Sequence, residues 1–146
     1  MTRTLILLVG AATVVAAFDL IHKQQAISEQ GGAVFLHDRP TRYVVAGAAL
    51  SLGWATAIAL TRSSSIAVFG GVVLGGAAGN LLSFALWPSL PGVPDPIVAG
   101  GLAFSFGDVA VLGGLVLLTP FAVLFARRNR NRLFQSAPRG ESLAND

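Results

Sequence analysis

The sequence contains no cysteine and few charged residues. Without cysteine, neither a disulfide framework nor a thiolate metal site can form. Only 12% of the 146 residues are charged, against roughly 25% in a usual soluble domain, while 53% are hydrophobic. The hydrophobic residues lie in long blocks, and a block of roughly 18 apolar residues is long enough to span the hydrocarbon of a bilayer. The composition therefore excludes an ordinary soluble domain and indicates an integral membrane protein.

Four apolar blocks predict four transmembrane helices within a single domain, residues 1–126. A polar stretch from Lys23 to Arg42, which can include a short β segment, separates the first two blocks, and four prolines between Pro88 and Pro96 forbid a regular helix before the last. The remainder, residues 127–146, is expected to be a basic, disordered tail. The predicted fold class is an all-α membrane protein, with spans at residues 4–21, 43–60, 66–87 and 104–126.

The basic residues near the span ends predict the orientation. Arg3, Arg62 and the arginines of residues 127–132 fall on one side of the membrane, and Lys23, Arg39 and Arg42 fall on the other. Because basic residues are enriched on the cytoplasmic side, the arginine-rich tail predicts cytoplasmic N- and C-termini, with the polar stretch outside. The arginines could form a nucleic-acid patch, but their place beside a span favours contact with anionic lipid and no nucleic acid.

The first block has a second interpretation. Arg3 precedes an apolar run that ends in the small residues Ala16 and Ala17, as in a cleaved signal peptide. That interpretation would leave three spans. Asp19 and Lys23, at and just after the end of the block, favour a retained first span because they can form a pair at the membrane interface.

Three acidic residues are expected at the outer ends of the spans: Asp19, Asp95 and Asp108. Each has an ordinary explanation by itself. Asp19 can pair with Lys23 one helical turn later, Asp95 lies between two prolines of a turn, and Asp108 is a helix-start acid. However, a charge near hydrocarbon is costly, and three acids at one membrane interface together predict a carboxylate site.

Paired carboxylates have a characteristic chemistry. Two of them close together do not both ionise easily, so they share a proton and hold a water between them. One carboxylate can take a proton from that water, which attacks a peptide carbonyl, while the other supports the oxygen on which charge develops. This is the chemistry of aspartic peptidases.

Four segments resemble those of a known family. Gly-Gly-Ala-Ala-Gly-Asn-Leu at residues 75–81 is the clearest, and the others are Val-Pro-Asp-Pro-Ile, Ala-Phe-Ser-Phe-Gly-Asp-Val-Ala and Asp-Leu-Ile-His-Lys, at residues 93–97, 103–110 and 19–23. A weaker match is Gln-Gly-Gly-Ala-Val-Phe at residues 30–35. In their order and topology, these segments resemble the bacterial lipoprotein signal peptidases (signal peptidase II), four-span aspartic peptidases of the bacterial cytoplasmic (inner) membrane.

The resemblance implies roles for individual residues. Asp95 and Asp108 take the places of the catalytic pair, and Asn80 that of a substrate-contacting asparagine. Asp19 and Lys23 take the places of a supporting pair, and Ser105, before the second catalytic aspartate, is a further supporting residue. The implied function is removal of signal peptides from prolipoproteins that carry a diacylglyceryl cysteine, with no cofactor. His22 and His37, the two histidines, do not complete a metal site of three or four ligands, and no metal is expected.

The sequence also departs from the family pattern. The family follows its Gly-Asn with x-x-Asp-Arg, where this chain has Ser83 and Phe84, and it has an asparagine at the place of Ser105. Two functions therefore remain open. One is a divergent peptidase. The other is an inactive relative that serves as a membrane subunit or as a partner binding lipid or a helix. A small transporter is a third class. Such proteins place polar groups near the bilayer midplane, and the second and third spans of this sequence lack charged residues there.

Overall fold

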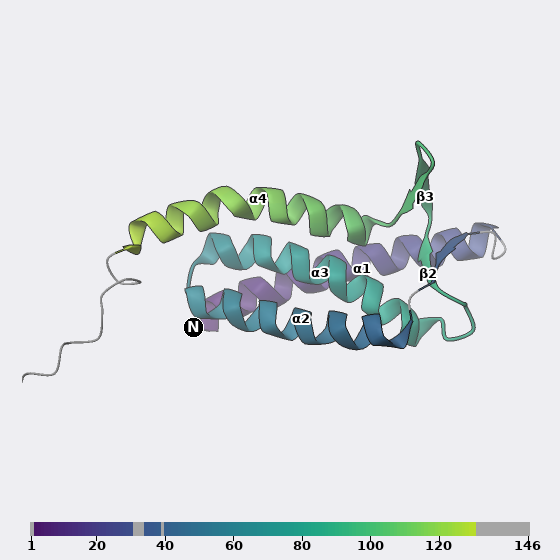
Figure 1. Cartoon of the computed structure of the whole chain (residues 1–146), viewed down its shortest axis with the longest axis horizontal. Helices are drawn as coiled ribbons and strands as arrows, with labels where there is room; N and C mark the ends of the chain where they lie inside the picture. The colour runs from purple at the N-terminus through teal and green to yellow at the C-terminus, as the bar shows by residue number, and fades with distance from the viewer. Residues whose placement is uncertain (1, 31–33, 39, 131–146) are drawn as a thin grey trace, which may run out of the picture.

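The computed structural model describes residues 2–30, 34–38 and 40–130, and within them the chain forms a bundle of four long helices (Figure 1). Their bounds are Thr2–Gln30 for α1, Thr41–Thr61 for α2, Ser64–Leu86 for α3 and Phe106–Arg128 for α4. Each helix is long and apolar enough to cross a membrane, as expected of a multi-pass membrane protein. The four predicted spans are thus confirmed as helices. Most of the tail predicted to be disordered, residues 131–146, lies outside the described residues.

Helix α3 is the centre of the bundle and packs against each of the other three helices (Figure 1). Near the turn between α2 and α3, buried apolar side chains form a hydrophobic core, and Trp54 on α2 donates its indole N–H to the backbone oxygen of Gly70 at 3.0 Å. The opposite end of the bundle, where α1 and α3 end and α2 and α4 begin, holds buried polar side chains. We call it the polar end. The core residues are Leu8, Ile58, Ile66, Ala67 and Leu118.

Helix α1 is longer than expected. The sequence predicts a span ending near Ile21 and a polar stretch from Lys23, whereas α1 continues unbroken to Gln30. Residues 23–30 contain neither proline nor glycine and are rich in glutamine, glutamate, alanine and lysine, which form helices well. Polarity marks the end of the apolar block, but it does not end a helix, so α1 extends beyond the predicted span.

Within the part of the chain that the structure describes, four three-residue strands lie at the polar end. β1 (Phe35–His37) pairs antiparallel with β2 (Val93–Asp95), so a β segment does follow the first helix. β3 (Ile97–Ala99) and β4 (Leu102–Phe104) form a hairpin whose two turn glycines have φ values of 60° and 79°, as tight hairpin turns require. The fourth span was expected from residue 104, but α4 starts at Phe106, after the hairpin.

Candidate functional site

Asp19 and Lys23 form a fully buried ion pair on successive turns of α1. Their side chains are 0% exposed, and Lys23 Nζ lies 2.7 Å from Asp19 Oδ2. The other carboxylate oxygen of Asp19 accepts a hydrogen bond of 2.6 Å from the backbone N–H of Gly107, in the first turn of α4. A helix N-terminus presents free N–H groups and favours a negative charge. The pair therefore fastens α4 to α1 at the polar end.

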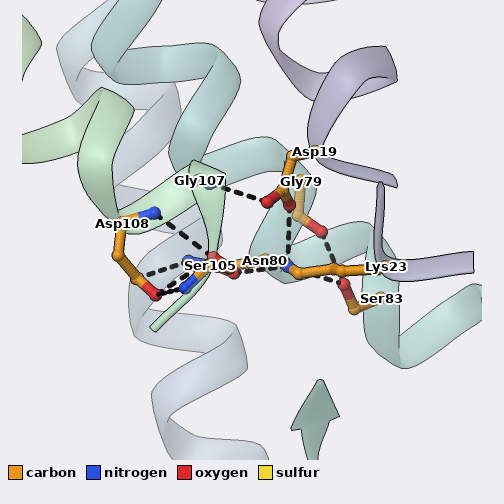
Figure 2. A network of polar contacts seen from close by, with 8 residues as sticks. All are labelled: Asp19, Lys23, Gly79, Asn80, Ser83, Ser105, Gly107 and Asp108. Atoms are coloured by element: carbon orange, nitrogen blue, oxygen red, sulfur yellow. Dashed lines mark hydrogen bonds and ion pairs between the residues drawn. The ribbon is translucent and has the colours of Figure 1, made fainter. Parts of the chain in front are cut away.

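The ammonium group of Lys23 connects α1 to α3 (Figure 2). It donates to Asn80 Oδ1 at 2.7 Å and to Ser83 Oγ at 3.3 Å, both on α3. The Ser83 hydroxyl donates in turn to the backbone oxygen of Gly79 at 2.7 Å. An ammonium carries three N–H donors, and Asp19, Asn80 and Ser83 supply three acceptors, so the donors of this buried cation are matched.

Asp108 receives hydrogen bonds from two neighbours. Asn80 Nδ2 donates to Asp108 Oδ1 at 2.9 Å, and the backbone N–H of Ser105 donates to Oδ2 at 2.9 Å. Ser105 Oγ lies 3.0 Å from the same oxygen, and it also accepts from the Asp108 N–H at 3.3 Å, which completes a capping box at the start of α4. The ordinary role as a helix-start acid is thus confirmed, and the same contacts fix the direction of the Asp108 carboxylate.

Asp95 reaches the polar end from a strand. It is the last residue of β2, pairs with Phe35 of β1, and its side chain is 3% exposed. The imidazole Nδ1 of His37 lies 3.9 Å from Asp95 Oδ2. Asp19 is the direct ionic partner of Lys23, and the charge of Lys23 also interacts electrostatically with Asp108 and Asp95. The direct approach of the Asp95 and Asp108 carboxylates to each other stays a prediction.

A cavity of about 440 Å³ opens at Asn80 and Asp108. Apart from these two residues and Tyr43, its walls are apolar. It adjoins a groove of about 610 Å³ along α2, α3 and α4, and the two share Gly47 and Ala77. The site can therefore receive a largely apolar molecule from the side of the bundle. The remaining cavity walls are Val44, Gly47, Ala77, Leu81, Phe84, Val111 and Leu112.

The close packing at Gly79 gives a first testable prediction. A Cβ at this position would lie 2.5 Å from Asp19 Oδ2, whose place is fixed by Lys23. We expect Gly79→Ala to lower the free energy of unfolding by about 1–3 kcal/mol, the usual cost of overpacking a core. Gly113→Ala on α4 is the control because a Cβ there meets no atom of the described residues within 4 Å. Unfolding in detergent micelles measures both, and equal stability of the two variants would contradict the packing.

The structure brings five of the six predicted site residues into one hydrogen-bonded network, and adds two contributors that the sequence analysis did not assign. The network joins Asp19, Lys23, Asn80, Ser105 and Asp108 (Figure 2), while Asp95 lies outside the contacts drawn. The additions are Ser83, judged only as a departure from the family, and the backbone N–H of Gly107. Ser83 lies three residues after Asn80 on a helix, a spacing that places both on one face and could have indicated its role.

Comparison with known proteins provides no family for this chain. No protein-family model, no curated protein and no solved structure matches it.

Proposed function

We propose that this chain is an intramembrane aspartic endopeptidase that resembles signal peptidase II and lies in a bacterial cytoplasmic membrane. The observation that carries the proposal is the setting of Asp108. Its carboxylate is oriented by Asn80 and Ser105 and lines a cavity that continues into an apolar groove. The ammonium of Lys23 interacts electrostatically with both Asp108 and Asp95, which supports their proposed pairing. A carboxylate of fixed orientation at the end of an apolar groove suits a largely apolar substrate that has a peptide bond to be cleaved at that end.

The proposed reaction uses the two aspartates as a pair that shares one proton. Asp108, held as an acceptor, takes a proton from a water, and the water oxygen adds to the carbonyl carbon of the scissile peptide bond. Asp95, carrying the shared proton, donates to the carbonyl oxygen as charge develops there. The C–N bond then breaks as the proton taken by Asp108 passes to the departing amine, and a hydroxyl of the intermediate returns a proton to Asp95 as the carboxylic acid product forms. Asn80 and Ser105 hold Asp108 in place throughout.

The groove supports a signal peptide as the substrate. Its α2 wall runs from Gly47 to Ala57, about 15 Å of helix at 1.5 Å per residue, and is built mainly of glycine, alanine and leucine. The apolar region of a signal peptide is a helix of roughly 7–15 residues, which is similar in length. In the proposed complex this helix lies along the groove, and the diacylglyceryl cysteine lies at the cavity, near Tyr43 and Phe84.

The groove also favours the second candidate function. An apolar groove can hold a lipid or a partner helix without any chemistry, and Phe84 gives the cavity an aromatic wall where the family has an arginine. An inactive relative serving as a membrane subunit would keep the groove and make no use of the aspartates. The ordered donors around Asp108 favour the peptidase, because mere binding of an apolar helix needs no directed carboxylate.

Cleavage by the purified chain tests the proposal. The full chain, reconstituted in lipid, is offered a diacylglyceryl-modified prolipoprotein, and the same prolipoprotein without the lipid is the control substrate. We expect release of the signal peptide from the modified substrate only. Binding of the modified substrate without cleavage would support the inactive relative instead.

The membrane orientation is a separate prediction. With cytoplasmic termini, a reporter fused after Asp146 is expected to be active only in the cytoplasm, and one inserted at Ser89 only outside. The reason is the excess of arginine at the end of α4, where Arg127 and Arg128 continue into the tail. Alkaline phosphatase and a fluorescent protein, active on opposite sides, measure this. An external C-terminus would overturn the proposed orientation.

A further inference from the structure

We propose that Ser83 and Lys23 are positioning residues that fix the orientation of the Asn80 side-chain amide, and through it the carboxylate of Asp108. The effect on kcat rests on the proposed peptidase function, whereas the orientation of the amide can be measured without any activity. Ser83 stands where the family pattern has an acid, so its role belongs to this chain in particular.

The two ends of the Asn80 amide have opposite neighbours. Its oxygen accepts from the Lys23 ammonium at 2.7 Å and lies 3.3 Å from Ser105 Oγ, while its nitrogen donates to Asp108 at 2.9 Å. A flipped amide would place N–H groups against the ammonium and an oxygen against the carboxylate. Both contacts would be repulsive, so the network selects one orientation. That orientation presents a donor to Asp108.

Lys23 can act on Asn80 only if its ammonium is itself held in place. Asp19 holds it from α1 at 2.7 Å, and Ser83 holds it from α3 at 3.3 Å. The Ser83 proton is directed to the backbone oxygen of Gly79, so the lone pairs of its oxygen face Lys23. The hydroxyl is therefore an acceptor of fixed direction. By accepting one N–H of the Lys23 ammonium, it holds the ammonium against α3, beside Asn80.

A neutral acceptor at residue 83 also preserves the strength of the Lys23–Asn80 bond. With Ser83, the ammonium has one direct ionic partner among the described residues, Asp19, and its charge still polarises the Asn80 amide (Figure 2). Polarising the amide oxygen makes the N–H groups of the same amide better donors. The buried cation thus acts on Asp108 through Asn80.

The main test compares Ser83→Ala with Ser83→Thr and Thr119→Ala. Ser83→Ala removes the acceptor from Lys23, and Ser83→Thr restores a hydroxyl. Thr119→Ala removes a hydroxyl that makes the same bond to the backbone oxygen four residues earlier, at 2.9 Å to Leu115, far along α4 from Lys23. On the lipid-modified prolipoprotein we expect Ser83→Ala to lower kcat by about tenfold, the effect of losing one net hydrogen bond, with KM little changed. Ser83→Thr and Thr119→Ala should keep kcat close to that of the parent.

A second measurement needs no activity. Asparagine-selective ¹⁵N labelling gives side-chain amide signals for four residues, and Asn80→Asp identifies that of Asn80 by its loss. In the full chain we expect this signal to shift in Ser83→Ala and to return in Ser83→Thr. An unmoved Asn80 signal in Ser83→Ala overturns the inference, and so does an equal shift in Thr119→Ala. If the parent cleaves no prolipoprotein, the proposed function fails while the amide signal still decides the inference.

Discussion

Asp108→Asn is expected to abolish prolipoprotein cleavage, with a loss in kcat of at least ~1,000-fold, as for removal of a residue that takes part directly in the chemistry. The substitution changes the volume of the side chain little. An asparagine oxygen can still accept from Asn80 or from the Ser105 N–H, which donate to the two carboxylate oxygens at 2.9 Å. What is lost is the group that takes the proton from water. The cleavage assay in reconstituted lipid measures this loss.

Asp95→Asn is expected to have the same effect, because a pair that shares one proton fails when either member is replaced. Asp38→Asn is the matched control. Asp38 is an exposed acid that follows β1, close in sequence to His37, and it has no role in the proposed chemistry. Full cleavage by either Asp95→Asn or Asp108→Asn would contradict the aspartic mechanism. The parent should also show a cleavage rate that falls on both sides of an optimum pH, since one proton must be present and the other absent.

The sequence predicted the helices well because their signal is strong. Long apolar blocks leave the chain no other satisfied backbone structure in hydrocarbon, so the four helices followed from composition alone. The ends were harder to predict. Residues 23–30 are polar and yet helical, and the hairpin of β3 and β4 falls in residues 97–104, which are apolar enough to continue a span. The polarity of a residue indicates whether it is expected inside or outside the membrane, but it does not determine whether the backbone is helical or extended.

The site was predictable where residues that can interact lie at a helical spacing in the sequence, as do Asp19 and Lys23, four residues apart. Contacts between distant elements were not predictable in this way. Nothing in the sequence near Gly107 indicates that its backbone N–H would bind Asp19, 88 residues away, because the contact depends on how α1 and α4 cross. Ser83 was interpreted only as a missing acid, whereas in the folded chain its hydroxyl accepts from Lys23. A substitution can thus replace a charge by a neutral partner of the same cation.

The second large effect concerns stability. Lys23→Met is expected to lower the free energy of unfolding by about 3–5 kcal/mol, because it leaves the buried carboxylate of Asp19 without its ionic partner. Methionine matches the lysine stem in length, so the loss comes from the charge and its hydrogen bonds more than from packing. The side chains of both residues are 0% exposed, so in the folded protein the carboxylate of Asp19 is shielded from solvent. Reversible unfolding in mixed micelles measures the change.

The double variant Asp19→Asn with Lys23→Met separates the ion pair from the remaining contacts. Removing both charges removes the uncompensated carboxylate as well, so the double change should cost less than Lys23→Met alone. The asparagine introduced by Asp19→Asn would still offer an oxygen to the Gly107 N–H, the bond of 2.6 Å that fastens α4 to α1. If the double variant were instead as unstable as the sum of the two single variants, Asp19 and Lys23 would not interact in the folded protein. The polar end would then be held by contacts other than the buried pair, and the orientation of Asn80 would need another source.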